Sequence, residues 1–264
     1  EAAANAGGQI LTAANAPRRE NLLGVVDWLV SELQQVGVPI HYDSYMEADD
    51  ILELNADIVI VATGGIPNFD FLEFGNDLAV STWDILNGQV PLGEEALVYD
   101  ENGTEVGPSC AEMMMNGGSK VEFMTRDRMI GSWVGATNYP PMLREIYKKC
   151  VKLSTDMQLI GIKKKDGRLE AHVWNDYSEE ASTCIVDQVV VEYGTLPNDD
   201  IYFDLKEGSQ NHGQIDFVEL TDFKPQTLGI NPGGNFRLYR IGDAVASRNI
   251  HASLYEARRL CQVF

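Results

Sequence analysis

Two long apolar runs most constrain how this chain can fold. The stretch Asp57–Gly65 is rich in β-branched residues and ends in the small residues Ala-Thr-Gly-Gly, and a second such run covers Cys184–Val191. A strand that is apolar at consecutive positions has both faces buried, which is typical of parallel sheets. Ligands of open parallel sheets bind beyond the carboxyl ends of the strands. The glycines that follow Ile58–Val61 therefore mark a first candidate site.

Shorter patterns predict the elements before this strand. Apolar residues recur at helical spacing from Pro17 to Gly37, with Pro17 suited to a first turn and Gly37 to a C-terminal cap. A short strand is expected at Val38–Tyr42, and an acidic turn at Glu47–Asp50. We therefore expect helix, strand and turn to precede the buried strand.

A second strand–helix–strand unit begins after residue 92. It consists of a strand at Ala96–Asp100, a helix at about Glu105–Asn116 and a strand at Lys120–Thr125. The elements predicted after it are a helix at Pro141–Val151, strands at Gln158–Lys163 and Arg168–Trp174 joined by a turn, a strand at Arg237–Ile241 and a helix at Asn249–Cys261.

This order predicts an α/β fold with two nested Rossmann-like dinucleotide-binding domains. Residues 1–92 and 205–264 would form the first domain, which lacks its N-terminal βα unit, and residues 93–204 would form the inserted second domain.

Charge and cysteine usage exclude several classes of partner. The formal net charge is −20, so the surface repels nucleic acids and anionic membranes, and no apolar run is long enough to span a bilayer. The four cysteines lack metal-ligand spacing, which indicates that the chain itself binds no metal. Isolated cysteines are typical of a cytoplasmic protein.

Three motifs are candidates for nucleotide binding. Glu1, followed by Gly8 and Gln9, resembles the acid that ends the second Rossmann strand and accepts hydrogen bonds from a ribose. The glycines of Ala62–Gly65 allow backbone to pass close to a ligand. Gly242-Asp243 brings a carboxylate to the start of a helix, whose amides favour a pyrophosphate. Taken alone, Glu1 is also compatible with a surface charge, Ala62–Gly65 with a tight turn, and Gly242-Asp243 with a turn and helix cap.

In this order the motifs resemble flavoproteins of the glutathione-reductase type with two dinucleotide domains. More narrowly, the chain is similar to the C-terminal part of the trimethylamine dehydrogenase and 2,4-dienoyl-CoA reductase family of iron–sulfur flavoproteins, and most to its dimethylglycine or N-methylproline demethylase-like branch. The segments that carry this resemblance are Arg18-Arg19-Glu20, Thr125–Gly131, Val134–Asn138, Val189–Asn198 and Ala246–His251.

The resemblance implies a set of cofactor contacts for FAD or ADP. Its expected members are Glu1 at the adenosine ribose, Gly8 and Gln9 beside the nucleotide, Met46 at the adenine, Ala62, Thr63 and Gly64 at the strand end, and Gly242, Asp243 and Ile250 around the remainder of the cofactor. The family also implies a preceding barrel with FMN and the substrate site, and a [4Fe–4S] cluster, none of which lies in this chain.

The second domain departs from the dinucleotide pattern. A G-x-G-x-x-G turn should follow its first strand, but the sequence there is Asp100-Glu101-Asn-Gly-Thr-Glu-Val-Gly107. Two carboxylates next to a pyrophosphate would repel it by a few kcal/mol at an effective dielectric constant of about 20. We therefore expect this domain to be a scaffold without NAD(P).

The resulting functional hypothesis is a segment of an oxidoreductase that demethylates a methylated amine. Its expected partners are its own barrel and cluster region, an electron-transfer flavoprotein and further copies of itself. The alternatives are a structural or docking module with vestigial nucleotide folds, and a segment of an NAD(P)H-dependent enoyl reductase. A released nucleotide would argue against the first, and absence of NADH oxidation against the second.

Overall fold

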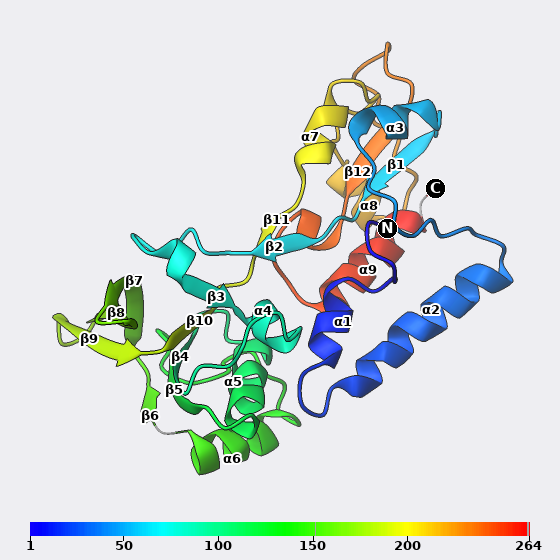
Figure 1. Cartoon of the computed structure of the whole chain (residues 1–264). Coiled ribbons are helices and arrows are strands. Elements are labelled where there is room, and N and C mark those ends of the chain that lie inside the picture. Colours follow the sequence, from blue (N-terminus) through cyan, green and yellow to red (C-terminus); the bar gives the residue numbers. More distant parts are fainter. Residues whose placement is uncertain (151, 263) are drawn as a thin grey trace. The chain divides into compact units, whose positions relative to one another are not determined.

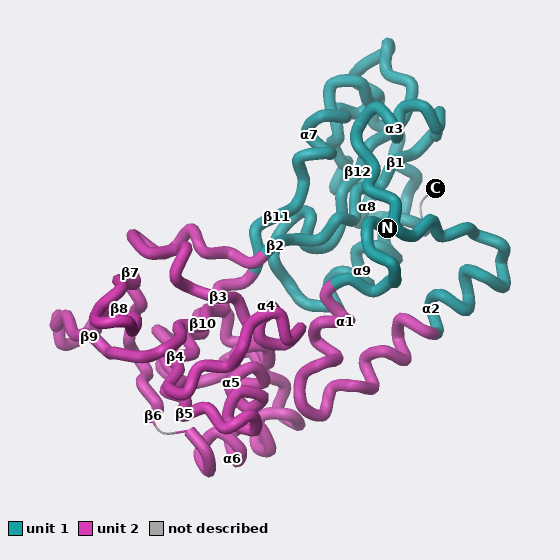
Figure 2. Tube along the Cα trace, viewed as in Figure 1, with its two compact units in different colours: residues 1–8, 28–66, 195–264 teal, residues 9–27, 67–194 magenta. Residues whose placement is uncertain are grey.

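The computed structural model describes residues 1–150, 152–262 and 264 of the chain. These residues divide into two compact units (Figure 2). Unit 1 comprises residues 1–8, 28–66 and 195–264, and unit 2 comprises residues 9–27 and 67–194. Because the division falls at Trp28, helix α2 (Leu23–Gln35) is shared between the units.

Unit 2 is built on a five-stranded parallel sheet with the strand order β3-β10-β4-β5-β6 (Figure 1). The strands are β3 (Ala79–Ser81), β4 (Glu95–Asp100), β5 (Lys120–Met124), β6 (Lys152–Ser154) and β10 (Gln188–Glu192). The strands predicted to begin at Ala96 and Lys120 are thus confirmed, and so is the α/β character of the fold.

Different layers cover the two faces of this sheet. Val98 and Val190 face a core that includes residues of the helices α4 (Thr82–Leu86), α5 (Val106–Asn116) and α6 (Tyr139–Lys149). Leu97 and Tyr99, which alternate with Val98, face an antiparallel sheet of β7 (Met157–Lys165), β8 (Arg168–Asn175) and β9 (Glu180–Val186). Strand β4 is therefore buried on both faces.

Three short helical segments complete unit 2. They are α1 (Gln9–Ala14), η1 (Glu20–Leu22) and η2 (Asn76–Leu78). The helix predicted at Pro141–Val151 corresponds to α6, and its predicted end at residue 151 lies outside the described residues.

Unit 1 contains a smaller parallel sheet, in which β1 (Ile58–Val61) pairs with β12 (Arg237–Arg240). A second pair joins β2 (Gly65–Pro67) to β11 (Thr195–Pro197). The helices are α3 (Ala48–Glu53), α7 (Asp200–Lys206), α8 (Phe217–Thr221), η3 (Gly242–Ala244) and α9 (Ile250–Cys261). Val61 and Leu238 pack with Leu205 of α7 in the core of this unit. None of the helices in the described ranges is long and apolar enough to cross a membrane.

The first predicted helix is shorter than expected. Arg18 has a φ of 65°, which is incompatible with a right-handed helix, so α2 begins only at Leu23. The predicted C-terminal cap is confirmed, because Gly37 has a φ of 74° directly after the helix and Val38 N–H donates to Leu33 O at 2.9 Å.

Two predictions after this helix are wrong. Within the described chain Val38–Tyr42 has no partner strand, and its contact with the N-terminus is a single hydrogen bond from the Glu1 amino group to His41 O at 3.0 Å. The predicted acidic turn at Glu47–Asp50 is instead the start of α3, where Glu47 N–H donates to the Asp50 carboxylate at 2.9 Å. Carboxylates at a helix N-terminus satisfy free amides and complement the helix dipole.

The two apolar runs also differ from their predicted form. The run Cys184–Val191 is divided into β9 and β10 by Asp187, whose carboxylate accepts from Glu95 N–H at 2.9 Å. In β1 only Val61 is buried, because the two-stranded sheet gives β1 a neighbour on one edge alone among the described strands.

Candidate functional site

The carboxyl ends of β1 and β12 form one edge of unit 1. Val61 lies opposite Arg240 in the parallel register, and Ile241 N–H donates to Val61 O at 3.0 Å. Ala62–Gly64 and Gly242-Asp243 therefore leave the sheet side by side. The structure thus brings together five of the predicted cofactor residues that are far apart in the sequence.

The turn after β1 is held by the segment that follows β11. Asn198 N–H donates to Gly64 O at 3.0 Å, and the Thr63 hydroxyl donates to Asn198 O. Gly64 has a φ of 75°, a conformation that favours glycine. A Cβ on Gly65 would lie 2.7 Å from Leu196 O, so this glycine is required by the neighbouring strand rather than by a ligand.

Asp243 is almost buried at this edge, with 8% of its surface exposed. Its carboxylate accepts from the Thr195 hydroxyl at 3.3 Å and from Arg248 N–H at 3.2 Å. Gly242 has a φ of 64°, and its N–H donates to Glu256 Oε2 at 2.9 Å. These contacts hold the carboxylate in place beside the strand end.

Helix α9 begins directly after this turn. Its first residue is Ile250, and the Asn249 side chain accepts from Ala252 N–H at 2.9 Å, which caps the first turn. Ile250 is half-buried. The predicted residues Gly242 and Asp243 thus lie in the connection from β12 to α9, and Ile250 begins α9.

Glu1 and Met46 belong to a second part of unit 1. Ser44 N–H donates to Glu1 O at 3.0 Å, which places Glu1 beside the segment that leads to Met46. The Glu1 carboxylate accepts from Ala3 N–H at 3.0 Å, and Met46 is 36% exposed.

Gly8 and Gln9 lie at the boundary between the units. Gly8 is exposed with a φ of 49°, and Gln9 is the first residue of α1. The division of the chain assigns Gly8 to unit 1 and Gln9 to unit 2.

A second strand-end cluster, in unit 2, includes residues that the sequence reasoning missed. Glu192 at the end of β10 lies opposite Asp100 at the end of β4, and both are buried. Thr82 Oγ1 donates to Glu192 Oε2 at 2.5 Å, and Asn102 Nδ2 donates to Glu192 Oε1 at 2.9 Å. Glu192 could have been found from its position directly after a buried apolar run.

Burial controls the protonation of these two carboxyl groups. Loss of solvent and then the nearby Glu192 carboxylate raise the pKa of Asp100 to about 8, against the lowering effect of two backbone N–H donors. Loss of solvent also raises the pKa of Glu192. The pair can therefore hold a proton at neutral pH.

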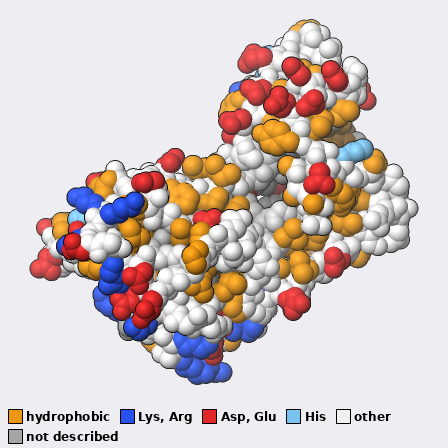
Figure 3. Space-filling model, viewed as in Figure 1, with side chains coloured by type: hydrophobic (Ala, Val, Ile, Leu, Met, Phe, Trp, Pro, Cys, Tyr) orange, Lys and Arg blue, Asp and Glu red, His pale blue; other side chains and the backbone are white. Residues whose placement is uncertain are grey.

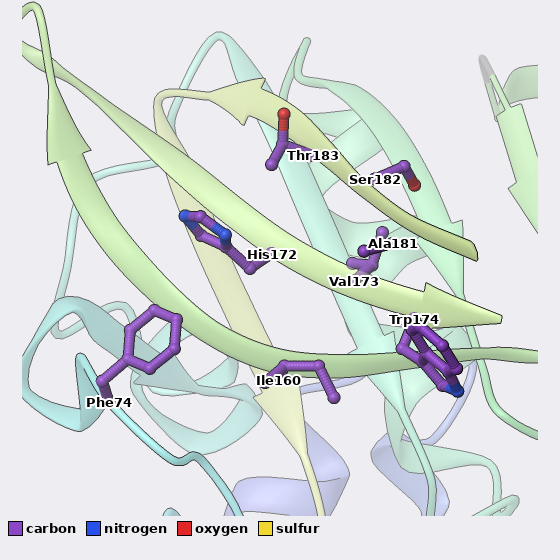
Figure 4. Close-up of a pocket in the computed structure, with 8 residues that line it drawn as sticks. All are labelled: Phe74, Ile160, His172, Val173, Trp174, Ala181, Ser182 and Thr183. Atoms are coloured by element: carbon purple, nitrogen blue, oxygen red, sulfur yellow. The ribbon is translucent and has the colours of Figure 1, made fainter. Parts of the chain in front are cut away.

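Unit 2 also has an aromatic groove on the outer face of β7–β9 (Figure 4). The Phe74 ring meets the His172 ring edge-on, with centroids 5.4 Å apart. The other lining residues are Ile160, Val173, Trp174, Ala181, Ser182 and Thr183. Local sequence patterns do not predict this groove, because it depends on the packing of Phe74 against Gly161 of the distant strand β7.

Comparison with known proteins gives matches along nearly the whole chain. No family model matches. The chain is 40% identical to a probable N-methylproline demethylase of Rhizobium meliloti over 98% of its length, and 38% identical to an N,N-dimethylglycine/sarcosine dehydrogenase of Chromohalobacter salexigens over its full length. The chain is a homologue of one part of these oxidoreductases. It spans 38–40% of their length.

Two solved structures share the fold of this chain. Histamine dehydrogenase from Rhizobium sp. 4-9 aligns with a TM-score of 0.79 at 21% identity, over 99% of this chain and 39% of that one. Thioredoxin reductase of T. acidophilum aligns with a TM-score of 0.53 at 17% identity, over 78% of this chain and 63% of that one. These likenesses show the fold, and the predicted resemblance to the N-methylproline and dimethylglycine demethylase branch is confirmed.

Proposed function

We propose that this chain is the adenine-nucleotide-binding segment of an oxidoreductase that removes methyl groups from a methylated amine. The observation that carries the proposal is the shared edge of β1 and β12, where Ala62–Gly64 and Asp243 lie together. The names of the relatives supply the reaction class, because two of them are a demethylase and a dehydrogenase of N-methylated substrates.

The proposed fold is a pair of nested Rossmann-like domains. Residues 1–92 and 205–264 would form the FAD- or ADP-binding domain without its first βα unit, and residues 93–204 the inserted domain, to whose sheet β3 (Ala79–Ser81) adds an edge strand. The parallel pairing of β1 with β12, which are far apart in the sequence, supports a domain that is interrupted by an insertion.

The residues at the edge fit an adenine nucleotide. Ala62 and Thr63 are small and exposed, and Gly64 adds no side chain, so a flat or phosphorylated group has access to the backbone. Asp243 would accept a hydroxyl of the ligand, and the amides at the start of α9 would face its phosphates. Glu1, Gly8 and Met46, which belong to the same unit, would complete the adenosine end. A bound FAD would supply electron transfer.

The rest of the reaction is assigned to residues outside this chain. A barrel with FMN would oxidise the substrate, a [4Fe–4S] cluster would take up the electrons, and an external acceptor such as an electron-transfer flavoprotein would receive them. This division is consistent with the relatives being about two and a half times as long as the chain.

The test is to denature the intact protein that contains this chain and to identify the released nucleotides by chromatography. We expect one FAD or ADP per chain in addition to any FMN. The Asp243→Ala variant should lose nucleotide affinity about 10- to 100-fold, the effect of removing a charged hydrogen-bond partner. The control is Asp204→Ala, which removes an exposed carboxylate from the same unit. Release of neither FAD, ADP nor AMP from the folded wild type would overturn the proposal.

A further inference from the structure

The strand order of unit 2 identifies where a ligand would bind. Strands β5 and β6 lie on one side of β4, whereas β10 and β3 lie on the other, so the order reverses between β4 and β10. In open parallel sheets the ligand crevice lies at this reversal, beyond the carboxyl ends of the strands. In unit 2 those ends are Asp100 and Glu192, which lie opposite each other in the register.

Asp100 makes the contacts that a phosphate makes in such folds. Its Oδ1 accepts from Asn102 N–H at 3.0 Å and from Gly103 N–H at 3.2 Å, the amides of the turn that leads into α5. Backbone amides in turns before a helix are general binders of anions. Here the anion is a side chain of the protein itself.

Gly107, in the first turn of α5, shows how closely this carboxyl group is packed. A Cβ on Gly107 would lie 2.7 Å from Asp100 Cγ, so only glycine leaves room for the carboxyl group. In dinucleotide-binding turns a glycine at this place allows the helix to approach the strand. Asp100 is 1% exposed, and its Oδ2 has no hydrogen-bond partner among the residues that the structure describes.

A second position in unit 2 follows the same pattern. Arg126 lies two residues after the end of β5, the neighbour of β4, and about 20 residues beyond Gly107, where NADP-binding domains place an arginine for the 2′-phosphate. Its guanidinium instead contacts Asp176 at 2.8 Å and Glu101 at 3.6 Å. Carboxylates of the chain again stand where phosphate oxygens would bind.

We infer that unit 2 has a dinucleotide-binding site that carboxylates of the chain itself occupy. We infer further that NADPH binds in this site once the Asp100 side chain is removed. Asp100 fills the pyrophosphate position. Asp176 and Glu101 form ion pairs with Arg126, the arginine that would otherwise bind the 2′-phosphate. Glu101 does not fill the pyrophosphate position together with Asp100. Its carboxylate contacts Arg126 and accepts a hydrogen bond from the Tyr99 hydroxyl at 2.5 Å.

The test is hydrogen–deuterium exchange of the intact protein with and without millimolar NADPH. In Asp100→Gly, NADPH should slow exchange in peptides that cover residues 101–110, and in wild type it should not. Asp100→Asn is the matched control, because it removes the charge but keeps the group that fills the space. Adding Asp176→Asn to Asp100→Gly should tighten NADPH binding at least tenfold and leave NADH binding unchanged.

Several results would overturn the inference. One is slowed exchange at residues 101–110 in wild type, and another is no change there in folded Asp100→Gly. If Asp100→Gly does not fold, Asp100→Ser takes its place with the same expected result. Slowed exchange confined to residues 62–66 and 242–250 would report the proposed site of unit 1 instead, so failure of this inference and failure of the proposed function are distinguishable.

Discussion

At the scale of single residues, Asp100 is a carboxylic acid buried in the interior of unit 2. Its carboxyl group is removed from solvent, close to Glu192 and in contact with Gly107. An isolated buried carboxylate is costly, so the group takes up a proton instead and its pKa rises to about 8. The protonated form is neutral, but it still accepts the two amide hydrogen bonds of the turn.

The stability of the protein should therefore decrease with rising pH through the titration of Asp100. The folded-state pKa of about 8 lies above the unfolded value near 3.9, so the contribution is complete below about pH 4 and is lost as the pH rises through 8. Each unit of pKa difference corresponds to about 1.4 kcal/mol. In Asp100→Asn this part of the pH dependence should disappear.

Urea unfolding at pH 5, 7 and 9 measures this effect. The control is Asp77→Asn, which changes an exposed carboxylate of the same unit and should leave the pH dependence as in wild type. Equal slopes of unfolding free energy against pH in Asp100→Asn and wild type would contradict the assignment. Glu192 and Asp127, which raise the pKa of Asp100 from neighbouring segments, are present in both proteins compared.

At the scale of elements, glycine has opposite roles in the helices α5 and α2. Gly107 in α5 is required, because the Asp100 carboxyl group occupies the place of a side chain. Gly24 in α2 is exposed, and a Cβ built on it would meet no atom of the described residues within 4 Å. In such a position glycine only weakens the helix through its backbone entropy.

The same substitution should therefore have opposite effects in the two helices. Gly24→Ala should stabilise the protein by about 1 kcal/mol, the difference in helix propensity. Gly107→Ala should destabilise it by about 1–3 kcal/mol, since overpacking forces buried groups to shift. Thermal unfolding of both variants measures the difference. In an Asp100→Gly background the cost of Gly107→Ala should vanish, and a cost that persists there would show that the Asp100 contact is not its cause.

At the scale of the whole molecule, negative charge is in large excess. No Lys or Arg occurs from Glu20 to Ser119, and the formal net charge is −20. Figure 3 shows acidic side chains gathered over the α3 and α7 end of unit 1, whereas Lys and Arg side chains appear near β7–β9 and α6 of unit 2. Repulsion among like charges destabilises a compact state and is screened by salt.

Salt should therefore stabilise this protein at neutral pH. Between low ionic strength and physiological salt, where the Debye length falls to about 8 Å, the unfolding temperature should rise by a few degrees. The same titration near pH 4.4, the isoelectric point, is the control and should show little change. An unfolding temperature at pH 7 that does not respond to salt would contradict the argument.

Local patterns predicted many elements correctly. The buried strand β4, the hairpin of β7 and β8 and the helices α5 and α9 follow from apolar spacing and from turn residues such as those around Asp166. Predictions failed where the structure of a segment depends on a residue or strand that is distant in the sequence. Val38–Tyr42 has strand-forming residues but no partner strand in the described part of the chain. Cys184–Val191 is divided because the Asp187 carboxylate accepts a hydrogen bond from Glu95 N–H, far away in the sequence.

For the candidate site, the sequence alone identified the residue types and their order: small residues after β1, and a glycine and a carboxylate after β12. These follow from local chemistry, since chain direction and residue size set what a strand end can offer. Only the tertiary structure decided that the carboxyl ends of β1 and β12 lie side by side and that Gly65 leaves room for β11. It also decided that Asp100 and Glu192 lie at one buried edge of the sheet. Parallel pairing joins residues far apart in the chain, so burial and pKa depend on neighbours that no local pattern specifies.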